Sequence, residues 1–183
     1  MKLHLGCGKI YIPGYTHVDI SKFEHIDIVS DIRNMPMFKD GVADLIYVSA
    51  AFQYFNRDEG VECLTEWNRI LKKGGSLMLS TVDFDQLLKV YEKTQDLKTV
   101  IGPLYGKMGK FEDDKEVSTI YHRTVYTTKE ILTMLNNAGF SDIKSYDYRK
   151  TIHKDYDDQS QSFFPHLDKQ NGIHIMQNWL AIK

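Results

Sequence analysis

The chain has 183 residues, of which 42% are hydrophobic and 26% are charged, and its formal net charge is −2. These values are typical of one globular domain with a full-sized core and argue against a broad nucleic-acid-binding surface. No apolar run approaches the length that spans a bilayer, no signal-peptide pattern precedes the first predicted strand, and the two cysteines match no metal or disulfide spacing. We therefore expect one cytoplasmic domain over residues 1–183 that binds no metal, nucleic acid or membrane.

The first predicted strand ends at a glycine turn. Residues 3–5 form a short extended run, and Gly6 and Gly8 then let the backbone turn tightly and approach a ligand, because glycine has no Cβ atom. Residues 18–20 are predicted to form a second strand, with Asp19 near its end. A glycine turn after one strand and a carboxylate at the end of the next is the layout of a nucleotide-type cofactor site. In such a site the carboxylate accepts two hydrogen bonds from a ribose diol.

The spacing within this stretch narrows the choice of cofactor. The dinucleotide fingerprint has a third glycine three residues after the second, where this chain has Tyr11. Asp19 also follows Gly6 too closely, because about twenty residues separate the glycines and the acid in that fingerprint. The short loop favours S-adenosylmethionine, whose adenosine and zwitterionic tail carry no phosphate. An ordinary glycine turn is the alternative.

The rest of the chain alternates predicted strands and helices, the pattern of an α/β sheet with mostly parallel strands. The further strands are predicted over residues 26–31, 44–49, 76–81, 143–148 and 174–182. The last strand has no room for a crossover helix before it, so we expect it to pair antiparallel. The predicted fold is a Rossmann-like, mostly parallel sheet with an antiparallel last strand, helices on both faces and a reduced first crossover helix.

Three predicted helices separate these strands. The first follows Asn56 and the last follows Thr127, and each of these residues has a glutamate three positions later, which is the pattern of a capping box. The middle helix covers residues 86–92, and the first helix is expected to end at Gly74 and Gly75. The apolar residues expected to face inward are Val61, Leu64, Trp67 and Leu71 in the first helix, Leu87, Leu88 and Tyr91 in the second, and Ile131, Leu132, Leu135 and Ala138 in the third.

Residues 102–126 interrupt this regular pattern. Gly102, Gly106 and Gly109 lie close together there, and an acidic run follows at residues 112–114. Loops longer than about 12–15 residues are uncommon in compact domains and often act as lids. We therefore expect an irregular lid excursion at 102–126.

Taken in order, these segments resemble the class I S-adenosylmethionine-dependent methyltransferases. The matching segments are residues 3–8 for the glycine motif, 18–20 for the acidic end of the second strand, 31–32 for the acidic position after the third, 44–49 for the fourth strand, 66–75 for the next helix-to-strand corner and 135–140 for the late helix end. More narrowly, the chain looks like small bacterial members associated with sugar or polysaccharide modification. In those, a Tyr-Gly element and a later histidine resemble Tyr105-Gly106 and His122-Arg123. Gln53-Tyr54 departs from that group, which usually has a Glu-His pair there.

The resemblance and the strand ends together indicate the candidate site. The expected cofactor-binding residues are Gly6, Cys7, Gly8, Asp19, Ile20, Asp31, Ile32, Ser49 and Ala50. In the family, the acid at the position of Asp31 binds the adenine amine. Methyl transfer depends mainly on in-line positioning and exclusion of water, because the sulfonium is already an activated leaving group. A hydroxyl acceptor can also use a general base, and His122 is the first candidate, with Tyr121 and Asp83 second. A structural loop histidine is the alternative for His122.

The predicted function is methyl transfer from S-adenosylmethionine to a small-molecule or sugar acceptor, with O-methylation as the expected chemistry. The departure at Gln53-Tyr54 keeps a non-catalytic S-adenosylmethionine-binding protein on the same fold as the alternative. An NAD(P)-dependent oxidoreductase is a minor alternative. The sequence leaves the identity of the acceptor and the oligomeric state open, because the fold and the cofactor site do not encode them.

Overall fold

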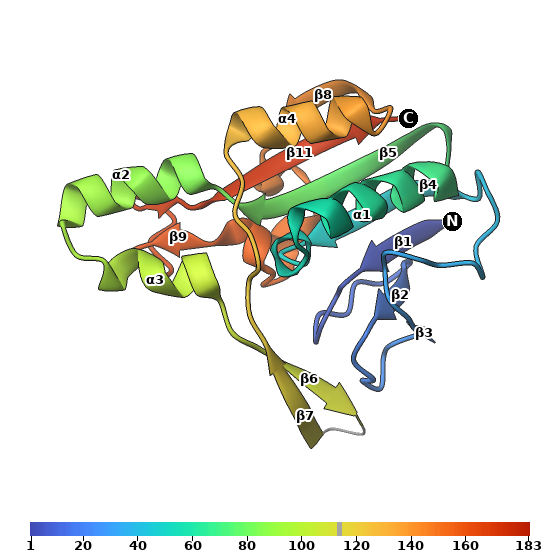
Figure 1. Ribbon diagram of the computed structural model, residues 1–183, viewed down its shortest axis with the longest axis horizontal. Helices are drawn as coiled ribbons and strands as arrows, with labels where there is room; N and C mark the ends of the chain where they lie inside the picture. Colours follow the sequence, from blue (N-terminus) through green and yellow to red (C-terminus); the bar gives the residue numbers. More distant parts are fainter. Residues whose placement is uncertain (113–114) are drawn as a thin grey trace.

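The main sheet organises the structure, a computed structural model that describes residues 1–112 and 115–183 (Figure 1). Asp113 and Asp114, which belong to the predicted lid, lie outside the described residues. Within the described residues the strands of this sheet are β1 (Lys2–Leu5), β2 (Thr16–Asp19), β3 (Ile28–Val29), β4 (Ala43–Ser49), β5 (Leu71–Val82), β8 (Ser141–Ser145) and β11 (Met176–Ile182). Their order in space is β3-β2-β1-β4-β5-β11-β8.

Strand directions confirm the predicted topology. The strands β1 to β5 run parallel to their neighbours, whereas β11 pairs antiparallel with both β5 and β8. Residues 6–15 connect β1 to β2 without an α-helix, as the short spacing predicted. The third strand is shorter than predicted and leaves Asp31 in a turn, and β8 begins and ends earlier than the predicted strand over 143–148.

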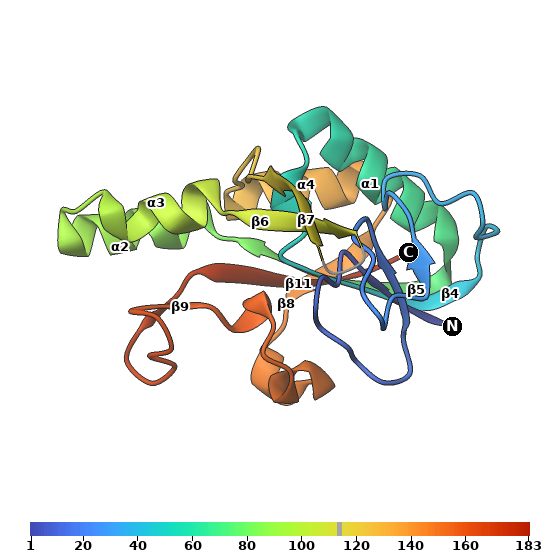
Figure 2. The same cartoon turned by 90° about the horizontal axis from the view of Figure 1, so that it is seen from below.

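The helices α1 (Arg57–Ile70) and α4 (Thr128–Asn137) cover one face of the sheet (Figure 2). Both capping boxes are present, with Asn56 paired to Glu59 and Thr127 paired to Glu130. The core between these helices and the sheet is mainly aliphatic. Trp67 is fully buried in it, and its indole N–H donates to the carbonyl oxygen of Ile32 at 2.9 Å.

The first helix ends earlier than the sequence predicted. Leu71 already has extended backbone angles (φ −65°, ψ 141°) and pairs with Ala43 of β4, so α1 stops at Ile70. Gly74, with φ +79°, falls in the irregular start of β5, where the register against β4 shifts. Val61 was expected inward but is 55% exposed on the outer side of α1. The end of α1 is therefore set by the pairing of Leu71 with β4 and by its burial, which outweigh the local helix-stop signal of Gly74 and Gly75.

The opposite face of the sheet is covered by short 3₁₀ helices and a loop rather than by α-helices. These are η2 (Tyr148–Lys150), η3 (Ile152–Asp155) and η4 (Gln159–Gln161), together with residues 10–15 (Figure 2). Tyr15 and Tyr47 pack there, and His4 and His153 are each 1% exposed. This face therefore has an aromatic and polar core.

A pair of helices projects from the carboxyl end of the sheet (Figure 1). They are α2 (Phe84–Thr94) and α3 (Lys98–Tyr105), and they pack with the hairpin β9 (Phe163–Phe164) and β10 (Ile173–His174). In α2 the buried residues are Leu87 and Val90, whereas Leu88 is 44% and Tyr91 40% exposed. The prediction that Leu88 and Tyr91 face inward was therefore wrong. Only a narrow face of α2, with Leu87 and Val90, packs against the rest of the chain.

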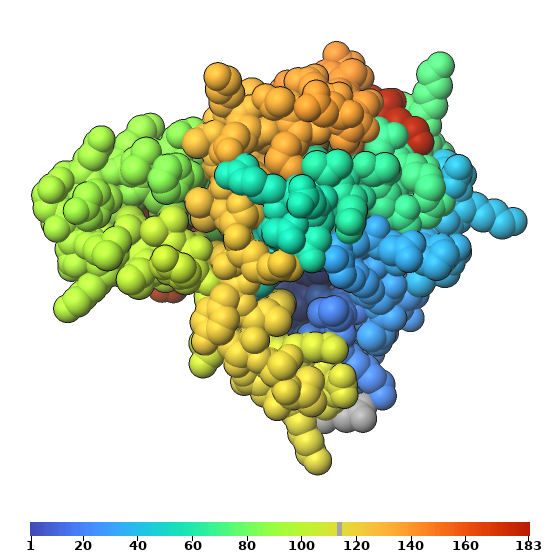
Figure 3. Space-filling view, viewed as in Figure 1, coloured from blue at the N-terminus to red at the C-terminus, as the bar shows by residue number. Residues whose placement is uncertain are grey.

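The region predicted as an irregular excursion is largely regular. It contains the end of α3 and a hairpin of β6 (Met108–Glu112) and β7 (Lys115–Ile120), and an extended segment then returns to Thr127. The hairpin docks on the residues after β2: the Lys22 amide donates to the Phe111 carbonyl oxygen at 3.0 Å, and the Phe111 amide donates to Ser21 Oγ at 3.3 Å. In the space-filling view the yellow hairpin lies against the blue N-terminal part of the chain (Figure 3).

Across residues 1–112 and 115–183, no helix is both long and apolar enough to cross a membrane. Over the same part of the chain, no group of three or more His, Cys, Asp or Glu side chains could hold a metal ion.

Candidate functional site

Two cavities open at the carboxyl ends of the parallel strands. The β2-side cavity, of about 440 Å³, is lined by Asp19 and Asp31 together with residues of the hairpin. The β5-side cavity, of about 640 Å³, lies under α3 and the C-terminal segment around residues 157–166. The residues that line both cavities are Gly6, Ala50, Tyr54 and Met108. The two cavities therefore adjoin one another at these four residues, which we call the junction of the cavities.

The glycine loop after β1 forms one side of the junction. Gly6 and Gly8 have φ values of +62° and +54°, a region that side chains rarely adopt. A Cβ atom on Gly6 would lie 2.4 Å from the Cβ atom of Ala51, whereas one on Gly8 would meet no atom within 4 Å. Gly6 therefore allows close packing, and Gly8 borders open space. Ala50 faces the loop from the end of β4 and itself has φ +55°, a strained conformation for alanine.

Asp19 connects the glycine loop to the end of β2. It is 2% exposed, and its Oδ2 accepts from the Gly8 amide at 2.8 Å while Oδ1 accepts from the Ser21 amide at 2.7 Å. Each carboxylate oxygen can accept a second hydrogen bond. Asp19 lines the β2-side cavity, so it can hold the glycine loop and still bind a pair of hydroxyl groups.

Asp31 lies further along the same cavity and is held by Arg33, which the sequence analysis did not identify. The Arg33 Nε atom lies 2.9 Å from Asp31 Oδ2, and Nη1 lies 2.9 Å from Glu59 Oε1. Burial raises the pKa of Asp31, but the hydrogen bonds from Arg33 outweigh it and leave that pKa below its usual value. An arginine two residues after the acid was the available sequence signal. Ile20 and Ile32 form apolar walls of this cavity.

Cys7 and Ser49 line the β5-side cavity. Cys7 is 5% exposed, and burial raises the pKa of its thiol. A buried thiol with a raised pKa is a poor nucleophile. Cys7 is therefore a small residue of the cavity wall.

His122 lines the β5-side cavity where the chain returns from the hairpin. Its Nδ1 atom lies 2.9 Å from the carbonyl oxygen of Pro103, and since a carbonyl only accepts, Nδ1 must carry the hydrogen. The Nε2 atom of this neutral tautomer is then the acceptor. Burial lowers the pKa of His122, so the ring stays neutral at neutral pH. The Tyr54 ring stands nearly perpendicular to it at a centroid distance of 4.7 Å.

The structure does not bring the other two candidate bases to His122. Tyr121 is 54% exposed and lines the β2-side cavity instead. Asp83 is 6% exposed and caps α2, accepting from the amides of Asp85 and Gln86. Neither of them is among the described residues that line the β5-side cavity.

Gln53, at the position of the family departure, is 1% exposed in η1 (Phe52–Tyr54). Its Oε1 atom accepts from Thr81 Oγ1 at 3.1 Å, and its backbone carbonyl accepts from the amides of Arg123 and Thr124. This side chain also lines the β5-side cavity. Gln53 therefore ties the end of β4 to β5 and to the segment that carries His122.

The C-terminal segment forms a wall of the β5-side cavity that was not predicted from the sequence. The residues of this segment that line the β5-side cavity are Asp157, Asp158, Gln159, Ser162, Phe163, Phe164 and His166. The segment is polar and unrepetitive, so no periodic signal placed it beside strands more than 100 residues earlier. Only the tertiary structure shows that it completes the cavity.

The mostly parallel sheet and the glycine loop after β1 form a Rossmann-like fold, a class in which ligands bind at the carboxyl ends of the strands. Residues 3–79 match the family model of a methyltransferase domain. An uncharacterized protein of Methanocaldococcus jannaschii, MJ1123, is 26% identical over 153 residues, which are 83% of this chain and 57% of that protein. The chain thus spans a little over half the length of the curated relative that it matches.

Solved structures share the fold at low sequence identity. An S-adenosylmethionine-dependent methyltransferase from Archaeoglobus fulgidus superposes with a TM-score of 0.60 and 13% identity, covering 100% of this chain and 85% of that one. One from Methanosarcina mazei gives a TM-score of 0.59 and 19% identity, covering 100% and 91%. A possible histamine N-methyltransferase from Thermotoga maritima gives 0.57 and 16%, covering 100% and 81%. The chain therefore shares the fold of these methyltransferases, and its residues 3–79 match the model of a methyltransferase domain.

Proposed function

We propose that the protein transfers the methyl group of S-adenosylmethionine to a small-molecule acceptor in the β5-side cavity. The observation that carries this proposal is the junction of the two cavities at Gly6, Ala50, Tyr54 and Met108. Adenosine in the β2-side cavity would bring the cofactor's sulfur to this junction, facing the second cavity. In-line methyl transfer needs this arrangement of donor and acceptor on opposite sides of one opening.

The residues present fit this cofactor. In the β2-side cavity, the acceptor capacity of Asp19 and the apolar walls at Ile20 and Ile32 suit an adenosine, with Asp31 available to the adenine amine. The open space beside Gly8 lies on the side of the β5-side cavity. We assign cofactor binding to Gly6, Cys7, Gly8, Asp19, Ile20, Asp31, Ile32, Ser49 and Ala50. When bound, S-adenosylmethionine supplies an activated methyl group. The protein's own task is to orient it and to exclude water.

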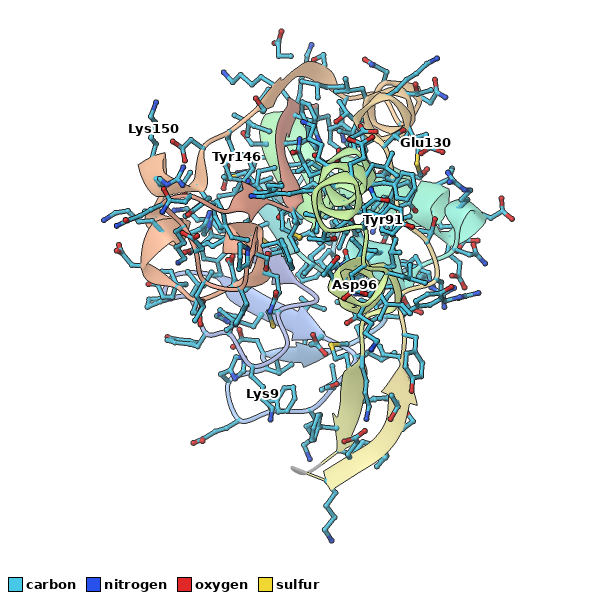
Figure 4. The ribbon with its side chains drawn as sticks, turned by 90° about the vertical axis from the view of Figure 1, so that its left-hand side faces the viewer. Lys9, Tyr91, Asp96, Glu130, Tyr146 and Lys150 are labelled. Carbon is cyan, nitrogen blue, oxygen red and sulfur yellow. The ribbon has the colours of Figure 1, made fainter. Side chains whose placement is uncertain are left out.

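The hairpin β6–β7 would serve as the lid within residues 102–126. Met108, Ile120 and Tyr121 line the β2-side cavity, so the hairpin and the segment after it cover the proposed cofactor. The Lys9 ammonium lies 4.6 Å from the centroid of the Phe111 ring and holds the hairpin against the glycine loop. Figure 4 labels Lys9 on the pale blue N-terminal part of the chain. A lid that excludes water strengthens the electrostatic interactions inside the site.

His122 would act as the general base for a hydroxyl acceptor, which makes O-methylation the chemistry that we propose. Its neutral tautomer leaves Nε2 as a proton acceptor, and His122 is among the residues that line the β5-side cavity. Sugars belong to this acceptor class, in agreement with the narrower resemblance of the sequence. The single domain, the cytoplasmic location and that subgroup all stay predictions.

One observation favours the non-catalytic alternative. Gln53 has no acidic or basic group, and its side chain is engaged in a buried hydrogen bond with Thr81. Two measurements separate the possibilities. Calorimetric titration should show binding of S-adenosylmethionine and none of NAD. Formation of S-adenosylhomocysteine with a panel of sugars, phenols and amines should then show turnover. Binding of NAD alone would contradict the proposal, and cofactor binding without turnover on any acceptor would support the non-catalytic alternative.

The role of His122 has its own test. Once an acceptor is found, His122→Ala should slow methyl transfer by roughly 10²–10⁴-fold, the usual contribution of a general base. Affinity for S-adenosylmethionine should barely change, because His122 is not among the residues to which we assign cofactor binding. The wild-type rate should fall at pH values below the pKa of His122, which burial lowers, and this acid limb should vanish in the variant. An unchanged rate and pH profile would mean that His122 is structural.

A further inference from the structure

Asp158 is a buried carboxylate in the wall of the β5-side cavity. It is 5% exposed, and it accepts hydrogen bonds from the Tyr47 hydroxyl and from the amide and hydroxyl of Ser160. Each of these three groups can donate, so the arrangement provides three hydrogen bonds to an ionised carboxylate, which accepts only. Burial raises the pKa of Asp158 above its usual value, although the hydrogen bonds from Ser160 and Tyr47 offset part of the rise.

The contact with Tyr47 locates Asp158 relative to the glycine loop. Tyr47 of β4 pairs in register with His4 of β1, and their rings lie 5.2 Å apart. Gly6 follows His4 by two residues, and Ala50 follows Tyr47 by three. Asp158 therefore lies beneath the carboxyl ends of the two strands that lead into the junction of the cavities.

The protein supplies no counter-charge to this carboxylate within its described residues. None of the ion pairs formed by residues 1–112 and 115–183 involves Asp158. His4 and His153, which pack against Tyr47, are neutral, because burial lowers their pKa values to about 3 and about 4. A buried charge without a partner is costly, so a cationic group of a ligand would be strongly favoured there.

We propose that Asp158 binds the α-ammonium group of S-adenosylmethionine, a role that rests on the proposed function above. The amino-acid tail of the cofactor begins at the sulfur, which that function locates at the junction of the cavities. A tail that continues into the β5-side cavity enters the space bounded by Asp158. Lys9 lines the same cavity and provides a positive charge for the carboxylate of the tail.

The test compares two ligands that differ in the tail. S-adenosylhomocysteine carries the ammonium and the carboxylate, whereas 5′-methylthioadenosine keeps the adenosine and the sulfur but lacks the amino-acid tail. In calorimetric titrations we expect Asp158→Asn to weaken S-adenosylhomocysteine binding by about 10- to 100-fold, the range for one hydrogen bond between charged groups. The affinity for 5′-methylthioadenosine should change by less than about twofold on the same grounds.

Two further variants control this comparison. Asp155→Asn removes an exposed carboxylate three residues earlier, paired with Lys154 outside the cavity, and should leave both affinities unchanged. Tyr47→Phe keeps the charge of Asp158 but removes one hydrogen bond that orients it. It should weaken only S-adenosylhomocysteine, by roughly 3- to 10-fold.

Three outcomes would overturn the assignment. An equal loss for both ligands in Asp158→Asn would mean that Asp158 only maintains the fold. An unchanged affinity for S-adenosylhomocysteine would place the ammonium elsewhere. If the wild-type protein binds neither ligand, the proposed function itself fails, and the assignment of Asp158 fails with it. Binding of both ligands by the wild type therefore separates the two failures.

Discussion

The two faces of the main sheet are built from different chemistry. Beneath α1 and α4 the strands contribute aliphatic residues, namely Leu3, Leu5, Ile46, Val48, Leu77 and Leu79, all fully buried. The opposite face contains His4, Tyr47, His153 and Asp158 under short 3₁₀ helices. Asp158 and His4 also line the β5-side cavity, so the polar face is the one that continues into the proposed site. The comparison teaches that stability and ligand recognition are assigned largely to opposite sides of one sheet.

The largest effect on stability should come from the aliphatic face. Trp67→Ala should lower the free energy of unfolding by about 3–5 kcal/mol, because it removes a fully buried indole and leaves a cavity. Urea unfolding measures this loss. Val61→Ala is the matched control on the same helix, and since Val61 is 55% exposed its effect should stay within about 0.5 kcal/mol. If both variants lost the same stability, the aliphatic face would not be the main source of stability.

The cofactor site at the end of β2 should show a smaller and more selective effect. Asp19→Ala should weaken S-adenosylmethionine binding by about 1.5–3 kcal/mol, because the ribose hydroxyls lose a charged acceptor and the Gly8 amide loses its partner. Isothermal calorimetry measures this change. Asp44→Ala removes a carboxylate at the other end of the sheet, where it pairs with Lys72, and should leave the affinity unchanged. An unchanged affinity in Asp19→Ala would contradict the assignment of the ribose.

The polar face should make stability depend on pH. His4 and His153 have pKa values of about 3 and about 4 in the folded protein, mainly because of burial, against about 6.5 in the unfolded chain. The unfolded chain therefore binds protons first as the pH falls, so the stabilisation is complete above pH 6.5 and declines toward pH 4. Between pH 6.5 and 5.5 the free energy of unfolding should fall by about 2 kcal/mol, close to 1 kcal/mol for each histidine.

Urea unfolding at several pH values between 7.5 and 4.5 tests this decline. His153→Gln keeps an amide beside the Tyr15 hydroxyl but cannot titrate, so its stability should depend less steeply on pH than that of the wild type. If stability depended on pH equally in the two proteins, protonation of His153 would not be coupled to unfolding. The contrast between the two faces would then rest on shape alone.

Local signals were sufficient for much of the fold. The capping boxes at Asn56 and Thr127 are confirmed, because each involves hydrogen bonds across three residues of one helical turn. The parallel order of the early strands and the antiparallel last strand are confirmed as well, since connection lengths restrict topology. The residues predicted around Gly6 and Asp19 also lie together, since the turn that joins them is short.

Other features depended on contacts that no local pattern encodes. The end of α1 follows from strand pairing at Leu71. The exposure of Val61 and Leu88 follows from which side of each helix packs against the rest of the chain. A regular hairpin replaces the predicted irregular excursion, and hydrogen bonds of Phe111 dock it on Ser21 and Lys22, 90 and 89 positions earlier. Propensity cannot anticipate such contacts, because they are decided by packing between distant segments.

The α/β architecture, the helix caps and the pairing of the glycine loop with Asp19 could be predicted from the sequence, because each rests on short-range geometry or on the period of apolar residues. The shared wall of the two cavities at Ala50 and the place of Asp158 in one of them could not. The physical reason is that a cavity is the space left between packed elements. Its lining is therefore set by long-range packing and not by any one segment.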